Sequence, residues 1–233
     1  MEATQIFDQK KYEDFVNMAV HELKTPVTVL KAYLQIIQQQ LQKENQDSHL
    51  KTVDKMDLQV DKLLNLISDL QDGLQANSEN LHCLINEFDI NETILSSVDN
   101  AKTTHTNCII EVDLDQINPL VRGDHYRVQQ IINNLINNAV KYSGLVKHVK
   151  IKSEVQKDCV KVSVQDNGRG IPEDQLQKIF QQFYRVPTAS KNQPSGLGLG
   201  LFICSEIIRK HDGRIGVNSV EGKGSEFWFS LKL

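Results

Sequence analysis

The chain is poor in cysteine, with four among its 233 residues. These four, Cys83, Cys108, Cys159 and Cys204, stand far apart in the sequence. Zinc sites and dithiol redox centres use closely spaced pairs, and the histidines show no metal-ligand spacing either. We therefore exclude zinc and dithiol chemistry, and we expect the cysteines to be reduced thiols that pack as small apolar residues.

Long apolar runs and an excess of basic residues are also missing. No stretch approaches 18 consecutive apolar residues, and the segment 1–11 is too polar for a signal peptide. A formal net charge of -4 lacks the basic excess that nucleic-acid binding requires. We expect a soluble, cytoplasmic chain that contacts neither nucleic acid nor membrane, although a longer parent protein could be membrane-anchored.

Two different periodicities divide the chain. Apolar residues alternate at steps of four and three from Val16 to Leu41, and again from Val53 to Leu74, which is a heptad pattern. Two such helices joined by the polar stretch 44–48 form an antiparallel hairpin whose apolar stripes stay partly exposed. Dimerisation into a four-helix bundle would cover them; the alternative is a hairpin that packs only on its own downstream domain.

Beyond Gly73 and the polar run 75–80, helix and strand patterns alternate, so we expect one domain at 1–76 and a second at 77–233. The second is expected to be an α+β two-layer sandwich, with one mixed sheet under a helical layer. Strands are predicted at 83–85, 108–112, 149–152, 160–164, 215–217 and 227–231, and helices near 91–104, 124–142, 173–181 and 199–211.

The predicted helix 124–142 carries polar residues that share one face at spacings of four, seven and eight: Asn134, Asn138, Lys141 and Tyr142. Magnesium prefers oxygen ligands and usually keeps waters, so amide and phosphate oxygens suffice to hold it. The ammonium group of Lys141 can neutralise phosphate charge. This face suits Mg²⁺ and phosphate, although a solvated amide-rich face would look the same.

A strand that ends at Asp166 runs into a turn with Gly168 and Gly170. A carboxylate there can accept a hydrogen bond from an exocyclic amino group, which distinguishes adenine from a base with a carbonyl at that place. The glycines let the backbone approach a ring closely. A turn without a ligand would have a similar sequence.

A second glycine segment opens the predicted helix 199–211, and its residues are Gly196, Leu197, Gly198, Leu199 and Gly200. Backbone N–H groups at a helix start bind phosphate. No Gly-Lys-Ser/Thr follows, so the segment is not a Walker A loop. The polar stretch before it is expected to form a mobile lid, with Phe180 and Phe183 at its base and Arg185 reaching the γ-phosphate.

The last motif is the segment 21–26, His-Glu-Leu-Lys-Thr-Pro, inside the first heptad helix. Together with the other segments it resembles the catalytic core of the sensor histidine kinases. The segment 21–26 is similar to the H box of that family, and 134–142, 166–170, 180–185 and 196–201 are similar to its N, G1, F and G2 boxes. The resemblance implies a dimeric histidine-phosphotransfer bundle followed by a Bergerat-fold ATP-binding domain.

The resemblance also implies roles for single residues. His21 would be the phosphoacceptor, since a neutral imidazole is well populated at physiological pH. Glu22 would polarise its Nδ1 proton, and Thr25 matches the position that orients water for dephosphorylating a partner. Pro26, which lacks an N–H, should kink the helix beside them. The phosphate would then pass to an aspartate of a response-regulator receiver domain.

Within the ATP-binding domain, the resemblance implies that Asn134 and Asn138 bind Mg²⁺. It also implies that Lys141, Arg185 and the backbone of 196–200 bind the triphosphate. Asp166 would recognise adenine. Leu197 departs from the usual Thr of the family, which removes one hydrogen bond to phosphate.

Two alternatives remain open from the sequence. Hydrolytic ATPases of the same fold carry a water-activating glutamate where this chain has Asn134, so slow hydrolysis is expected here. The other alternative is a nucleotide-binding scaffold, or a regulator whose main activity is that of a phosphatase. It would bind ATP without phosphorylating itself.

Overall fold

The structure is a computed structural model that describes residues 19–20, 22–37, 39, 52–53, 55–57, 59–60, 63–64, 66–68, 70–71, 73, 83–144, 146–187 and 196–233. The chain folds as two compact units, one formed essentially by residues 1–72 and the other by most of residues 73–233. Within the described part, no helix is long and apolar enough to cross a membrane.

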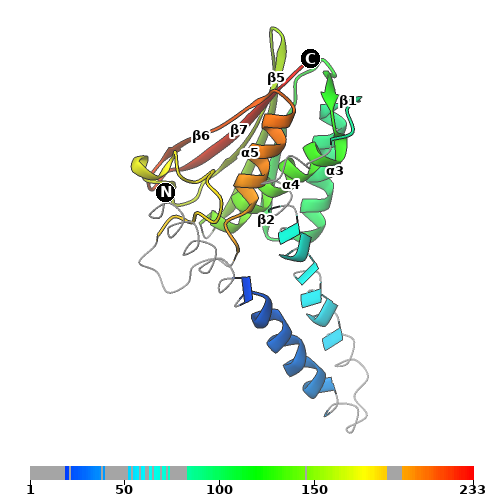
Figure 1. The fold of residues 1–233 in the computed structure, drawn as a ribbon, viewed down its shortest axis with the longest axis vertical. Coiled ribbons are helices and arrows are strands. Elements are labelled where there is room, and N and C mark those ends of the chain that lie inside the picture. The colour runs from blue at the N-terminus through cyan, green and yellow to red at the C-terminus, as the bar shows by residue number, and fades with distance from the viewer. Residues whose placement is uncertain are drawn as a thin grey trace, which may run out of the picture. The chain divides into compact units, whose positions relative to one another are not determined.

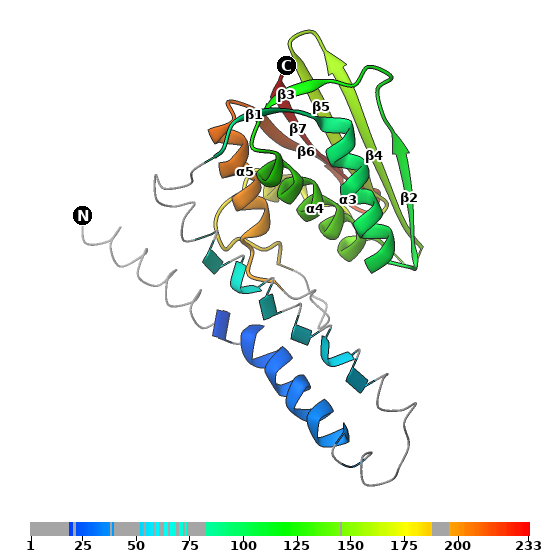
Figure 2. The ribbon, with the colours of Figure 1, turned by 90° about the vertical axis from the view of Figure 1, so that its right-hand side faces the viewer.

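The described residues of segment 1–72 are helical, between 19 and 39 and again between 52 and 71. The two helical stretches run side by side (Figures 1 and 2). Residues 22–37 form a continuous helix that passes through Pro26.

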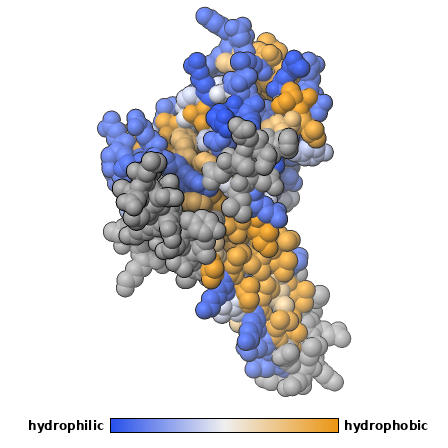
Figure 3. Space-filling view, in the orientation of Figure 1, coloured by the Kyte–Doolittle hydropathy of each residue, from blue (hydrophilic) through white to orange (hydrophobic). Residues whose placement is uncertain are grey.

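One apolar layer of this unit is exposed. In the first helix, Val20, Val27 and Leu34 follow one another at seven-residue steps and are each at least 50% exposed. In the second helix, the same spacing relates three residues that are between 41% and 50% exposed, Val53, Val60 and Ile67. The alternate heptad positions, Leu23, Leu30, Ile37, Met56, Leu63 and Leu70, are half-buried. The hairpin therefore leaves an apolar face uncovered, and Figure 3 shows apolar side chains gathered along this unit.

The second unit contains seven strands, three α-helices and a short 3₁₀ helix in its described residues. In chain order they are β1 (Asn86–Asp89), α3 (Ile90–Thr104), β2 (Cys108–Asp113), β3 (Leu120–Gly123), α4 (His125–Tyr142), β4 (Lys147–Gln156), β5 (Cys159–Asp166), η1 (Glu173–Gln175), α5 (Gly200–Lys210), β6 (Arg214–Val220) and β7 (Gly224–Lys232).

Five of the strands form one mixed sheet in the order β2-β4-β5-β7-β6. Strand β2 pairs parallel with β4, and the other neighbours are antiparallel. Strands β1 and β3 form a separate antiparallel pair. Figures 1 and 2 show the three α-helices on one face of the larger sheet. The predicted two-layer α+β sandwich is therefore confirmed.

Helix α4 is central to the helical layer. It begins after Asp124, whose side chain accepts a hydrogen bond from the backbone N–H of Arg127 and so caps the helix. Its buried side recurs at steps of three and four: Val128, Ile131, Ile132, Leu135, Ile136, Ala139 and Val140. This stripe packs toward the sheet, where the side chains of Val162 and Val164 on β5 are fully buried. The polar residues Asn134 and Asn138 lie away from this buried stripe and are half-buried.

A buried histidine ties α5 to the start of α4. The Nδ1 atom of His211 lies 2.7 Å from the carbonyl oxygen of Ile207, and its Nε2 atom accepts the backbone N–H of Asp124 at 2.8 Å. Only the neutral tautomer with the proton on Nδ1 satisfies both contacts. A Cβ atom on Gly123 would lie 2.7 Å from the imidazole ring, so glycine is needed there.

Two local predictions were wrong, and one strand was missed. Residues 83–85 form no strand; the strand is β1, which is stabilised by pairing with β3. Strand β3 itself was not predicted, because its four residues carry too short a pattern. The predicted helix 173–181 is only the 3₁₀ turn η1 followed by further turns. Strands β1 and β3 depend on pairing with each other across the sequence, which local propensity does not encode.

Candidate functional site

The polar face of α4 presents two stacked amides. The Nδ2 atom of Asn138 donates to the Oδ1 atom of Asn134 at 3.1 Å, and both side chains are half-buried. This bond uses an amide hydrogen of Asn138 and leaves its oxygen available as an acceptor or a metal ligand. Asn137 lies outside this pair, because its Oδ1 atom is 3.0 Å from the Nε2 atom of His105.

The start of α5 lies directly against the first of these amides. A Cβ atom on Gly200 would lie 2.6 Å from both the Nδ2 and the Oδ1 atoms of Asn134. No other residue fits there without moving the amide. The N–H groups of the first turn of α5 have no partner inside the helix, and they carry the positive end of its dipole. The start of α5, whose first N–H groups suit an anion, is thus next to a pair of amides whose oxygens suit a metal ion.

The segment before α5 is held by the stretch that contains Phe180 and Phe183. The backbone N–H of Phe183 donates to the carbonyl oxygen of Gly198 at 3.0 Å. Gly198 has a φ of +69°, and a Cβ atom on it would lie 2.9 Å from the carbonyl carbon of Phe183. Phe183 also has a positive φ, of 64°. The two segments are therefore joined by close backbone contact, which only glycine at 198 permits.

The carboxylate of Asp166 stands at the end of β5, where it is 6% exposed. Its Oδ1 atom accepts the backbone N–H of Gly168 at 2.7 Å, and the backbone N–H of Ser225 also donates to the carboxylate. Burial raises the pKa of Asp166 above its ordinary value, and the two N–H donors oppose that shift. This acceptor is therefore buried and oriented before any ligand arrives.

The turn after Asp166 is pressed against the end of α4. A Cβ atom on Gly168 would lie 2.3 Å from the carbonyl oxygen of Tyr142. The Tyr142 ring has the Lys141 ammonium nitrogen and the Arg169 guanidinium carbon at 5.2 Å from its centroid, within cation–π range. Two cations thus gather where the carboxyl end of α4 meets the turn, and they complement the negative end of the dipole of that helix.

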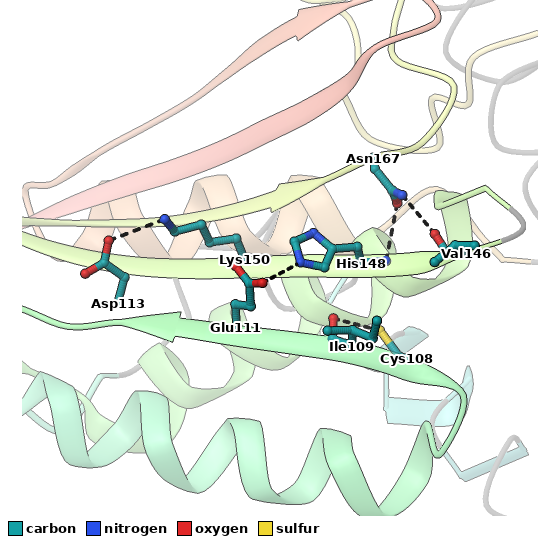
Figure 4. A network of polar contacts seen from close by, with 8 residues as sticks. All are labelled: Cys108, Ile109, Glu111, Asp113, Val146, His148, Lys150 and Asn167. Atoms are coloured by element: carbon teal, nitrogen blue, oxygen red, sulfur yellow. Dashed lines mark hydrogen bonds and ion pairs between the residues drawn. The ribbon is translucent and has the colours of Figure 1, made fainter.

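Asn167 was not among the predicted site residues, and its role is structural. Its Nδ2 atom donates to the carbonyl oxygen of Val146 at 2.8 Å, and its Oδ1 atom accepts the backbone N–H of His148 at 3.3 Å (Figure 4). The side chain therefore points toward the start of β4. On the same face, His148 pairs with Glu111 at 2.9 Å, and Lys150 pairs with Asp113 at 3.5 Å.

The structure describes most of the remaining predicted site residues. Phe180 and Arg185 are half-buried, and Gly196 and Leu197 precede the close contact at Gly198, with Leu199 directly before α5. Glu22 is half-buried and Thr25 exposed on the first helix of the other unit. His21 and the part of the predicted lid at 188–195 lie outside the described residues. No cluster of three His, Cys, Asp or Glu side chains able to hold a metal occurs among the residues that the structure describes.

Comparison with known proteins defines first the class and then the family. Residues 123–233 match the family described as histidine kinase-, DNA gyrase B- and HSP90-like ATPase, and residues 11–73 match the His Kinase A (phospho-acceptor) domain. The fold is thus that of this ATP-binding class. Since the phospho-acceptor domain precedes it, the chain belongs to the sensor histidine kinases, which confirms the family suggested by the sequence motifs.

Individual relatives agree. The chain is 31% identical over 244 residues to the sensor protein GacS of Pseudomonas syringae pv. syringae, covering 100% of this chain and 26% of that one. It is 30% identical over 229 residues to the sensor histidine kinase WalK of Bacillus subtilis, covering 96% and 37%. The chain spans about a quarter to a half of the length of the curated relatives described by these matches.

Solved structures support the same assignment. The catalytic domain of the histidine kinase ThkA is 32% identical with a TM-score of 0.56, covering 64% of this chain and 95% of that one. The Acinetobacter baumannii histidine kinase AdeS is 25% identical with a TM-score of 0.67, covering 91% and 97%.

Proposed function

We propose that the chain transfers the γ-phosphoryl group of ATP to the imidazole of His21, and from there to an aspartate of a response-regulator receiver domain. The observation that carries the proposal is the convergence of four segments in the second unit. Helix α4 contacts the turn after β5 through Tyr142 and the start of α5 through Asn134, and the backbone of Phe183 contacts Gly198 just before α5.

Within this site, Asn138 and Asn134 would hold Mg²⁺ through their amide oxygens. The donor set fits, because Mg²⁺ prefers oxygen ligands and needs few from the protein. When bound, the metal would neutralise charge on the triphosphate. Lys141, Arg185 and the backbone of 196–200 would share that task and aim the γ-phosphoryl group, since phosphoryl transfer depends mainly on positioning and electrostatics.

Asp166 would recognise adenine through its exocyclic amino group. Two backbone N–H donors support this role, because they already orient the carboxylate before the base binds, so that no reorientation is needed. Gly168 and Gly170 would let the base approach the turn closely.

The phosphoacceptor role of His21 rests on the match of 11–73 to the phospho-acceptor domain. Its Nε2 atom would attack the γ-phosphorus in line while Glu22 polarises the Nδ1 proton. Thr25, one helical turn after His21, would orient water when the chain acts as a phosphatase on the phosphorylated partner. We assign 1–76 to dimerisation and phosphotransfer, and 77–233 to ATP binding.

A homodimer is proposed from the exposed heptad layer. Val20, Val27 and Leu34 on one helix and their counterparts on the second would meet the same residues of a second copy, giving a four-helix bundle. A receiver domain is the proposed partner of the bundle; one solved structure is of ThkA in complex with the response regulator protein TrrA. Because the reaction consumes ATP, we place it in the cytoplasm.

The two rival functions make different predictions. Hydrolysis is disfavoured, because Asn134 occupies the position of the water-activating glutamate and its amide is not a base at neutral pH. A scaffold or phosphatase would bind ATP and acquire no phosphate.

Incubation of the intact chain with Mg²⁺ and γ-labelled ATP tests the proposal, beside His21→Gln, Asn138→Ala and the control His49→Gln. We expect acid-labile, alkali-stable label on the intact chain and on the control, and none on the other two variants. Label that persists on His21→Gln refutes the phosphoacceptor assignment. ATP binding without label supports the scaffold, and ATP turnover without label supports the hydrolase.

A further inference from the structure

The hairpin between β6 and β7 contains a hydroxyl pair that lies beside the turn after Asp166. The Oγ atom of Ser219, near the end of β6, is 2.9 Å from the backbone nitrogen of Ile171, 3.0 Å from the carbonyl oxygen of Gly224 and 2.9 Å from the Oγ atom of Ser225. Ser219 is half-buried, and Ser225 is 6% exposed.

One arrangement of protons satisfies all three contacts. A hydroxyl has one hydrogen to donate and two lone pairs to accept. The Ile171 N–H can only donate and the Gly224 carbonyl can only accept, so Ser219 gives its hydrogen to Gly224. The hydrogen between the two hydroxyls must then come from Ser225. Ser219 therefore accepts hydrogen bonds from two groups at once, the backbone N–H of Ile171 and the side-chain hydroxyl of Ser225.

Both residues are connected to the carboxylate that the proposed function assigns to adenine, Ile171 through the turn and Ser225 through its backbone N–H. Ile171 directly follows the turn that contains Gly168 and Gly170, and the backbone N–H of Ser225 donates to Asp166. The backbone of the β6–β7 hairpin also contacts the turn directly. The N–H of Gly222 donates to the carbonyl oxygen of Arg169 at 2.6 Å, and a Cβ atom on Gly170 would lie 2.1 Å from the carbonyl oxygen of Val220.

We propose that Ser219 is a positioning residue for nucleotide specificity, which acts by holding Ile171 and Ser225 so that Asp166 and its turn keep the geometry that accepts the exocyclic amino group of adenine. Ser219 does not itself touch the base. The inference rests on the proposed role of Asp166, but it assigns specificity to a residue 48 positions away from its partner Ile171.

The experiment compares two nucleotides by calorimetry with the intact chain and Mg²⁺: ATP, and purine riboside triphosphate, which lacks the exocyclic amino group. The wild-type chain should prefer ATP. In Ser219→Ala, ATP binding should weaken about tenfold, the size expected when one charge-assisted hydrogen bond is misaligned. Binding of the analogue should change by less than about twofold, because it makes no bond to Asp166. The preference for ATP therefore collapses.

Two further variants separate positioning from folding. Ser219→Thr keeps the hydroxyl and should retain the preference for ATP. Ser219→Cys is similar in size but replaces the hydroxyl by a thiol, so it should lose the preference. If Ser219→Ala unfolds at the assay temperature, Ser219→Cys takes its place in the test. The control Asn218→Ala removes only an exposed bond to Glu226 and should leave both affinities unchanged.

Equal weakening of both nucleotides in Ser219→Ala, or an unchanged preference, would overturn the proposal. A wild-type chain with no preference for ATP would overturn it as well, together with the role of Asp166. Labelling of His21 in that chain would then show whether the kinase function itself stands, so the two failures are distinguishable.

Discussion

Replacing Gly200 by alanine should damage catalysis without damaging the fold. The added Cβ atom would lie 2.6 Å from the amide of Asn134, whereas carbon and nitrogen or oxygen atoms ordinarily approach to about 3.5 Å. The amide must therefore move by roughly 1 Å, and a misplacement of that size in a catalytic site costs about 100-fold in rate. The backbone at the first position of α5 suits alanine, and the amide can swing away, so stability should fall little or even rise by about 0.5 kcal/mol.

The assay for this prediction pairs the initial rate of autophosphorylation at saturating ATP with the midpoint of thermal unfolding. Gly144→Ala is the matched control, because the nearest atom to its added Cβ would be the carbonyl oxygen of Asn167 at 3.9 Å. We expect Gly200→Ala to lose about two orders of magnitude in rate at an unchanged midpoint, and Gly144→Ala to lose little. A Gly200→Ala variant with the wild-type rate would show that the amide of Asn134 does not hold the reacting phosphate.

Three other perturbations test single contacts. Ser97→Ala should raise the free energy of unfolding by about 1 kcal/mol in urea titrations, since the hydroxyl of Ser97 is fully buried without a hydrogen-bond partner; a loss of stability would contradict this. Hydrogen bonds from the backbone N–H groups of Val155 and Ile117 hold the pKa of Asp115 below its ordinary value. The stabilisation is therefore present above about pH 4 and is lost as the pH falls through the lowered pKa, so the stability deficit of Asp115→Asn should shrink in acid rather than persist. Because burial raises the pKa of Asp166 and adenine needs its charged form, acidification should weaken ADP binding at a higher pH than an ordinary aspartate would, and Asp166→Asn should lack that component in calorimetry.

Elements with strong local patterns could be predicted from the sequence. Helix α4 combines a capping Asp124 with an apolar stripe of three- and four-residue steps, and it was placed within one residue of its observed start. Strands β5 and β7 alternate apolar residues over eight and nine positions and were found, although shorter than observed. Strands β1 and β3 have four residues each and depend on pairing with each other, so no local signal marks them.

In the candidate site too, the residues within local sequence motifs were predicted and those that depend on distant contacts were not. Asn134, Asp166 and Gly200 stand in motifs whose spacing suggested a nucleotide site, and the structure brings their segments together. Asn167 and Ser219 were missed, because Asn167 bonds to partners 19 and 21 positions away and Ser219 bonds to Ile171, which is 48 positions away. Serine in a strand is compatible with a solvated surface, and only the tertiary pairing of β6 with β7 brings its hydroxyl under the turn.

The most direct test of the account locates the phosphate on the chain. After incubation with Mg²⁺ and ATP, tryptic digestion kept at alkaline pH should release the segment 12–24, which contains His21 but no serine or threonine. We predict that mass spectrometry finds one phosphate on this segment, that fragmentation assigns it to His21, and that brief acid treatment removes it. Phosphate on Tyr12 or on any other segment, or an acid-stable adduct, would contradict the assignment of this chain as a kinase that phosphorylates His21.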